Sequence, residues 1–156
     1  MAQLFDYFVC PRSTIEQWIS ALEQQDDELR DKIESEMPQS ITLQTVGQEE
    51  LNILAGCARS EEVDTVKAVA QVDLVKALTD EEGPWVVAFP QPTVEAIAEM
   101  NVNPALVHRW IKAVSEYQGN NDDSRQAYLT TDAALTLKKI CTEAVQERLY
   151  VFTCFY

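Results

Sequence analysis

The strongest constraint on the fold of this chain is that both of its ends are aromatic and apolar. Residues 4–10 read LFDYFVC and residues 150–156 read YVFTCFY. Seven of the thirteen aromatic residues lie in these two segments: Phe5, Tyr7, Phe8, Tyr150, Phe152, Phe155 and Tyr156. Chain ends fray in water unless they pack against the rest of the molecule, and frayed apolar ends invite aggregation. We therefore predict that the two ends pair as neighbouring strands of one sheet.

The stretch that follows the first strand has a helical pattern. Ser13 and Glu16 stand in capping-box spacing, which predicts the start of a helix. Apolar residues then recur at helical spacing, and Leu29 and Ile33 extend the same stripe towards Met37. We therefore predict one helix that runs on until Pro38 ends it.

The middle of the chain alternates between short extended and helical patterns. Strands are predicted over 41–46 and 85–89, and a helix over 48–58. The stretch 63–78 fits a helix in its early part and extended chain later. Three more helices begin near Pro92, after Asn103-Pro104 and by Thr131, where caps or first-turn prolines precede apolar stripes.

These patterns predict an α+β fold with a small sheet that includes the N- and C-terminal strands as neighbours. Four to five amphipathic helices pack against that sheet. A length of 156 residues favours a single globular domain over 1–156, since domains usually hold about 100–200 residues.

Composition excludes several classes of function. The chain has 26 acidic and 12 basic residues, for a formal net charge of −14, which disfavours nucleic acid and anionic membranes as direct partners. No apolar run approaches the roughly 20 residues of a membrane span. The N-terminus has no basic region before an apolar stretch, so we expect no secretory signal and a cytoplasmic location. We expect no cofactor and no metal.

Residues that carry chemistry are few. The four cysteines (Cys10, Cys57, Cys141 and Cys154) are scattered without a C-x-x-C pair, so we expect buried, reduced thiols. The single histidine, His108, lies off the apolar stripe of its helix, which favours a solvent-facing position. A small enzyme that pairs a Cys with His108 stays an alternative.

The negative charge is concentrated in two stretches, 23–36 and 61–82, each with a net charge of −5. An acidic face formed by these stretches would attract cationic proteins, so the expected partner is a basic protein. Trp85 follows an acidic turn and is a candidate interface anchor. The candidate partner-binding residues are Asp26, Asp27, Asp31, Glu61, Glu62, Asp80, Glu81, Glu82 and Trp85.

The leading hypothesis is therefore a non-enzymatic protein-binding module of inhibitor, immunity or adaptor type. A third hypothesis is a homo-oligomeric structural protein in which sheet edges or Trp85 make the contact.

Overall fold

The computed structural model describes residues 3–59, 73–77, 84–119 and 126–155. The described helices and strands follow one another along the chain without regular alternation. They are β1 (Leu4–Cys10), α1 (Arg12–Glu23), α2 (Asp27–Glu36), β2 (Gln39–Gln44), α3 (Gln48–Ala58), β3 (Asp73–Ala77), β4 (Trp85–Ala88), α5 (Gln91–Glu99), α6 (Pro104–Gln118), α8 (Thr131–Glu147) and β5 (Tyr150–Phe155).

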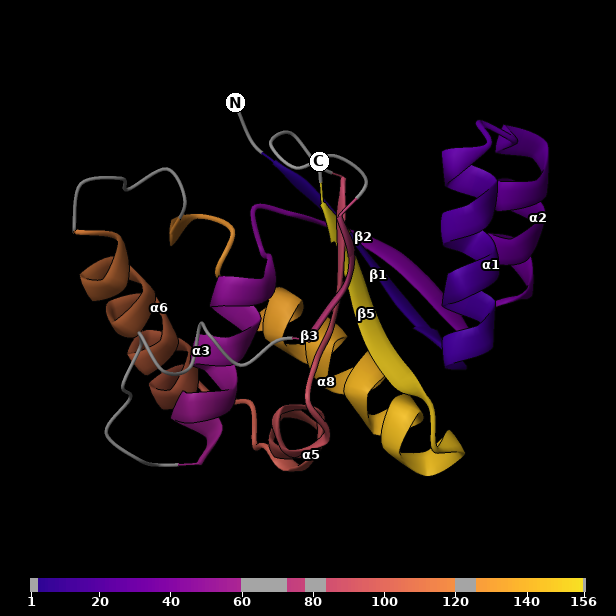
Figure 1. The fold of residues 1–156 in the computed structure, drawn as a ribbon. Helices are drawn as coiled ribbons and strands as arrows, with labels where there is room; N and C mark the ends of the chain where they lie inside the picture. The colour runs from indigo at the N-terminus through magenta and orange to yellow at the C-terminus, as the bar shows by residue number, and fades with distance from the viewer. Residues whose placement is uncertain (1–2, 60–72, 78–83, 120–125, 156) are drawn as a thin grey trace.

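The five strands form one sheet in the order β2-β1-β5-β4-β3, with every neighbouring pair antiparallel. The first and last strands lie side by side, in a register that runs from Phe5 opposite Phe155 to Cys10 opposite Tyr150. Figure 1 shows β1 and β5 together in the middle of the sheet. The predicted α+β fold and the pairing of its two ends are confirmed.

Helices cover both faces of the sheet, which explains why the terminal strands are apolar on both faces. Phe5, Tyr7 and Val9 belong to a large core formed with α3, α5, α6 and α8. Phe8 and Cys10 point to the opposite face and belong to a smaller core formed with α1 and α2. The molecule therefore has three layers, with the sheet between the two sets of helices (Figure 1).

The first helical stretch differs from its prediction at its start. Helix α1 begins at Arg12, and Pro11 is its N-cap, without a side-chain cap. The predicted capping box between Ser13 and Glu16 is therefore wrong. The Glu16 carboxylate instead lies 3.5 Å from the Arg12 guanidinium, one helical turn away.

The same stretch also forms two helices rather than one helix that ends at Pro38. The backbone of Gln25 turns into the left-handed region (φ 56°), and the Asp26 side chain then caps α2. The described part of the chain consequently holds six helices instead of four to five. Helices α1 and α2 form an antiparallel hairpin, since the short turn reverses the chain (Figure 1).

A close contact between β1 and α3 determines where α3, the first helix of the large core along the chain, begins. Strand β2 ends at Gln44 rather than at residue 46, because Thr45 adopts a left-handed backbone (φ 63°) that redirects the chain. Gly47 then becomes the N-cap of α3, against the ring of Phe5. The buried Glu50 carboxylate accepts a hydrogen bond from the Gly47 N–H at 3.2 Å.

Several predicted elements are confirmed within a residue or two. They include the helix over 48–58, the Asn103 cap, whose side-chain oxygen accepts from the Leu106 N–H at 2.9 Å, and the strand that ends in Phe155. The early part of 63–78 lies outside the described residues, and 73–77 is a strand, as predicted for the later part. Among the described helices, no segment combines the length and the apolar character that a bilayer crossing requires.

Candidate functional site

The acidic stretch 23–36 forms the turn and the second helix of the α1–α2 hairpin, which is a layer of its own on one face of the sheet. The helices are anchored by their apolar stripes, since Ile15 and Trp18 are almost fully buried. The Trp18 ring lies 4.9 Å from the ring of Phe8 on β1, measured between centroids. Burial of a large aromatic side chain contributes about 2–3 kcal/mol, so this contact fixes the hairpin firmly on the sheet.

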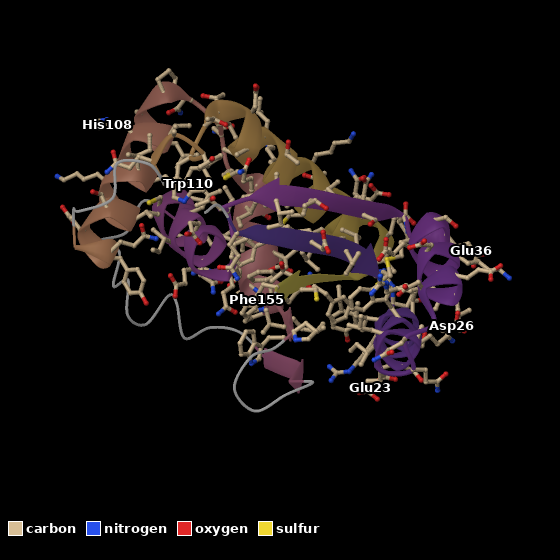
Figure 2. The ribbon with its side chains drawn as sticks, turned by 90° about the horizontal axis from the view of Figure 1, so that it is seen from above. Glu23, Asp26, Glu36, His108, Trp110 and Phe155 are labelled. Atoms are coloured by element: carbon tan, nitrogen blue, oxygen red, sulfur yellow. The ribbon has the colours of Figure 1, made fainter. Side chains whose placement is uncertain are left out.

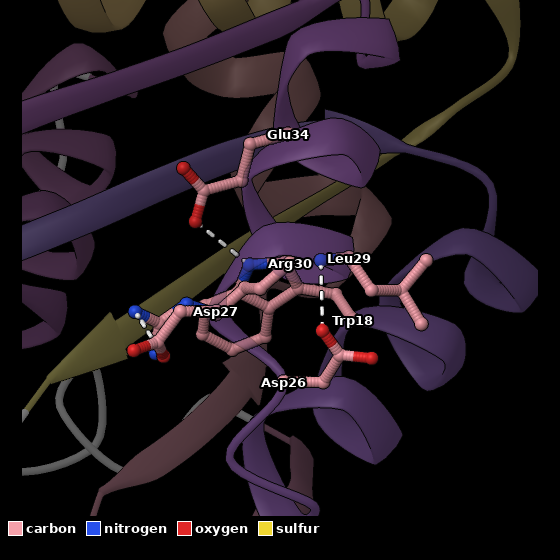
Figure 3. Close-up of polar contacts among 6 residues, drawn as sticks. All are labelled: Trp18, Asp26, Asp27, Leu29, Arg30 and Glu34. Carbon is pink, nitrogen blue, oxygen red and sulfur yellow. Dashed lines mark hydrogen bonds and ion pairs between the residues drawn. The ribbon is translucent and has the colours of Figure 1, made fainter.

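One polar contact joins the two helices of the hairpin, and two others stabilise the first turn of α2 (Figure 3). The Trp18 indole N–H donates to the Glu34 carboxylate at 2.8 Å, which joins α1 to α2. The Asp26 carboxylate accepts from the Leu29 N–H at 3.1 Å and so satisfies the first turn of α2. Arg30 and Asp27 form an ion pair at 3.3 Å. The hairpin is therefore a defined surface rather than a loose acidic tail.

The outer side of the hairpin carries a groove of about 400 Å³ between the two helices. Leu29 lines this groove with 41% of its surface exposed. The prediction that Leu29 continues the buried stripe of a single helix is wrong, because the turn at Gln25 changes the direction in which α2 presents its residues. The other lining residues are Gln17, Ser20, Ala21, Gln24, Lys32, Ile33 and Glu36.

The hairpin that carries this groove is acidic, and Glu36 and Lys32 are the charged residues in the groove lining. Within residues 12–36, eight acidic residues (Glu16, Glu23, Asp26, Asp27, Glu28, Asp31, Glu34 and Glu36) face three basic ones (Arg12, Arg30 and Lys32), so the hairpin has a net charge of −5. All of these acids except Glu34 are exposed. Figure 2 shows Glu23, Asp26 and Glu36 at the outer end of the molecule, away from the larger helical layer. We call the exposed residues of 12–36 the hairpin surface.

The predicted partner-binding residues fall into three groups: exposed on the hairpin, half-buried on the sheet, and outside the described residues. Asp26, Asp27 and Asp31 are exposed and lie together on α2 and its N-cap. Trp85 is only half-buried, and its ring stacks on that of Phe155 at 5.3 Å on the far strand pair β4–β5. Glu61, Glu62, Asp80, Glu81 and Glu82 lie outside the described residues.

The groups that a Cys–His enzyme would need differ in their exposure to solvent. His108 is exposed on α6, whereas all four cysteines are buried free thiols. Burial raises the pKa of both Cys10 and Cys141 to about 12. Burial also raises the pKa of Cys57, against a smaller lowering by the Arg109 guanidinium, which donates to the Cys57 carbonyl. A thiol without its thiolate form is a poor nucleophile, so this geometry does not favour the Cys–His alternative.

Sequence reasoning missed the groove because it did not divide the first helix. The signal was present, since Asp26 precedes two acids, Asp27 and Glu28, in the pattern of an N-cap and an acidic first turn. Among the described residues, no three His, Cys, Asp or Glu side chains are grouped as a metal site would require.

The comparisons with known proteins inform the fold alone. No protein-family description matches the chain, and no curated protein matches it in sequence. Among solved structures, YfbM from Escherichia coli, a protein of unknown function, is similar with a TM-score of 0.51 and 12% sequence identity. The match covers 98% of this chain and 99% of that one. The whole α+β architecture described above is therefore shared with a solved protein.

Proposed function

We propose that this chain is a non-enzymatic protein-binding module that docks a cationic protein on the hairpin surface. The observation that carries the proposal is the exposed Leu29 in a groove at the centre of the most acidic described stretch. An apolar contact surrounded by charge is the usual anatomy of a protein interface.

The two features of the hairpin surface supply different parts of the binding energy. The net charge of −5 over residues 12–36 steers a basic partner and raises its association rate. Leu29, together with Ile33 beside it in the groove, gives the bound partner an apolar contact, which slows dissociation. Charge alone would attract any cation, and the groove adds the shape that selects one.

The groove favours a helix as the docking segment of the partner. Its α1 wall includes the small residues Ser20 and Ala21, and small side chains let a third helix approach closely. A matching helix carries Lys or Arg on its flanks, where it meets Glu36 in the groove and the field of the other exposed acids of the hairpin surface. It carries an apolar residue at its centre, where it covers Leu29.

A matched pair of charge variants tests the proposal. The hairpin variant carries Glu28→Gln, Asp31→Asn and Glu36→Gln, which are exposed acids outside the Asp26 cap and the Asp27–Arg30 ion pair. The control carries Glu95→Gln, Glu99→Gln and Glu116→Gln on α5 and α6. Both variants change the net charge equally, so they differ only in where the charge is removed.

The measurement is capture of partners from a native-host lysate at low ionic strength, with wild type and both variants as bait. We expect a basic protein that the control retains and the hairpin variant binds at least about threefold more weakly, since rim charges contribute about 0.2–1 kcal/mol each. Added salt is expected to weaken the wild-type complex as well. Equal capture by the two variants, or no captured basic protein, would overturn the proposal.

A further inference from the structure

The sheet has one edge that is unlike the edges of most sheets, and it lies on strand β2. Strand β2 is the first strand in the order β2-β1-β5-β4-β3, so only β1 pairs with it in the described structure. Natural sheets protect such edges with charges, prolines or bulges, because unpaired backbone groups bind any other strand. Residues 39–44 read QSITLQ and contain none of these devices, and their pairing with β1 has no register shift.

The opposite edge shows the usual protection. Strand β3 contains Asp73 and Lys76, and its pairing with β4 shifts register between Leu74 and Lys76. A register shift at one edge, with none at the other, points to β2 as the edge that is kept open for a partner.

The register shows which backbone groups of β2 face outward. The Thr45 N–H donates to the Gln3 carbonyl at 2.7 Å, so alternate residues back along β2 (Leu43, Ile41 and Gln39) are hydrogen-bonded to β1. The N–H and C=O groups of Ser40, Thr42 and Gln44 consequently point away from the sheet. The side chains of these three residues are exposed.

We infer that the β2 edge is a homodimer interface, in which β2 of a second copy pairs antiparallel about a twofold axis at Thr42. In this register Thr42 faces its own counterpart and Ser40 faces Gln44 of the other copy, so all three outward-facing residues form hydrogen-bonded pairs. A shift by two residues in either direction leaves one of the three without a counterpart among them.

The side chains on the helix-covered face fit the same register. Ile41 of one copy meets Leu43 of the other in a non-hydrogen-bonded pair, where side chains approach most closely. Both residues are half-buried against the large core, so pairing would remove their remaining exposed apolar surface from water.

Charge favours a second copy at this edge over the rest of the surface. Two chains of net charge −14 repel each other, and the contact must therefore avoid acidic regions. Strand β2 itself is uncharged, the Asp6 carboxylate beside it accepts a hydrogen bond from the Thr42 hydroxyl at 2.6 Å, and the adjoining groove on α8 balances Lys138 and Lys139 against Glu143 and Glu147. The groove borders the strand directly, since the Gln39 side-chain amide donates to Glu143 at 2.6 Å.

Disulfide trapping on the full chain tests both the dimer and its register. Thr42→Cys places two new thiols at about 5.5 Å between Cα atoms, within the range that a disulfide spans. Ser40→Cys is the matched control, because its two copies are offset by four residues, or about 13 Å. The native cysteines are buried and give little background.

We expect rapid oxidative crosslinking of Thr42→Cys, little of Ser40→Cys alone, and crosslinking again of the Ser40→Cys, Gln44→Cys double variant. Equal crosslinking of the two single variants would overturn the register, and none in Thr42→Cys would overturn the interface.

Sedimentation velocity supplies a second measurement that needs no crosslink. Wild type is expected to dimerise, with a dissociation constant that falls as salt screens the net charge. Thr42→Pro removes an outward N–H and no backbone hydrogen bond to β1, together with the hydrogen bond from the Thr42 hydroxyl to Asp6, and is expected to weaken the dimer at least about tenfold. The Ser40→Lys, Gln44→Lys double variant opposes like charges across the interface and keeps both the backbone and the Thr42–Asp6 bond, and it gives the same loss if the proline variant fails to fold.

A wild-type chain that stays monomeric at about 0.5 mM would overturn the inference, whether or not the edge then binds an extended segment of another protein. Salt is expected to strengthen this dimer and to weaken the complex of the proposed function, and the two sets of variants change different residues. The outcomes of the two tests can therefore be distinguished.

Discussion

Replacement of Gly47 by alanine tests the contact that places α3 under the sheet. A Cβ at this position would lie 2.3, 2.4 and 2.8 Å from three carbons of the Phe5 ring. Carbon atoms in contact lie about 3.5–4.0 Å apart, so the overlap exceeds an ångström. The ring has little room to withdraw, because Phe5 is 9% exposed and its centroid lies 5.7 Å from that of Phe155.

The expected cost follows from two opposing effects. Overpacking of a buried site costs about 1–3 kcal/mol. The backbone of Gly47 (φ −110°, ψ −159°) is extended and suits alanine, so the variant recovers about 0.4–1 kcal/mol from the lower entropy of its unfolded chain. We expect Gly47→Ala to lower the free energy of unfolding by about 1–2 kcal/mol, measured by urea denaturation followed by circular dichroism and tryptophan fluorescence.

Two further variants isolate the cause. In a Phe5→Leu background the smaller side chain makes room, and Gly47→Ala is expected to cost less than about 0.5 kcal/mol. Gly119→Ala is the control, because that glycine has a left-handed backbone (φ 83°) and no described atom lies within 4 Å of the added Cβ. Its cost arises from the backbone alone and stays the same in both backgrounds. An equal cost of Gly47→Ala in the wild-type and Phe5→Leu backgrounds would refute the reasoning.

Three more predictions concern buried groups. Asn52 is 3% exposed, and neither its side-chain oxygen nor its nitrogen has a hydrogen-bond partner among the described residues. Asn52→Leu removes the cost of burying those atoms and is expected to raise the free energy of unfolding by about 1–3 kcal/mol, and a decrease in the same denaturation assay would contradict this account. Cys10 and Cys141 have folded pKa values of about 12 against an ordinary 9.0, so the unfolded chain loses these protons first as the pH rises. These two thiols therefore do not change the free energy of unfolding below about pH 9. Above that pH they lower it, by up to about 1.4 kcal/mol per pH unit for each thiol. Urea denaturation at pH values from about 8 to about 11 would measure this decline. For the same reason we expect iodoacetamide to label the native thiols slowly near neutral pH and the thiols of the unfolded chain quickly. A single native thiol that reacts fast would contradict this expectation and would favour the Cys–His enzyme.

Local signals in the sequence were reliable where a single residue type decides the backbone. The Asn103-Pro104 start of α6 is such a case, because a side-chain cap and a proline act within one helical turn. The same kind of signal at Asp26 was outweighed by the apolar spacing of Leu29 and Ile33, which fits one long helix equally well. Only the turn at Gln25 separates the two possibilities, and nothing in the identity of a glutamine predicts a left-handed backbone.

The candidate site was predictable in its charge and not in its shape. Counting acids placed Asp26, Asp27 and Asp31 in one acidic stretch, since charge is a property of composition. The groove around Leu29 depends on how α2 folds back along α1, which the Trp18–Glu34 hydrogen bond and burial against Phe8 determine together. These contacts join residues of different helices and strands, so the pattern of no single element contains them.

By itself, the sequence determined that the two ends of the chain are strands and that they share a sheet. Aromatic residues on both faces of 4–10 and 150–155 leave no stable alternative in water, and the hydrophobic effect enforces this without regard to detail. Only the tertiary structure decided which backbone groups of β2 remain unpaired within the described chain and which face of α2 meets solvent. Those outcomes depend on strand register and helix direction, which arise from many weak contacts acting together over long sequence separations.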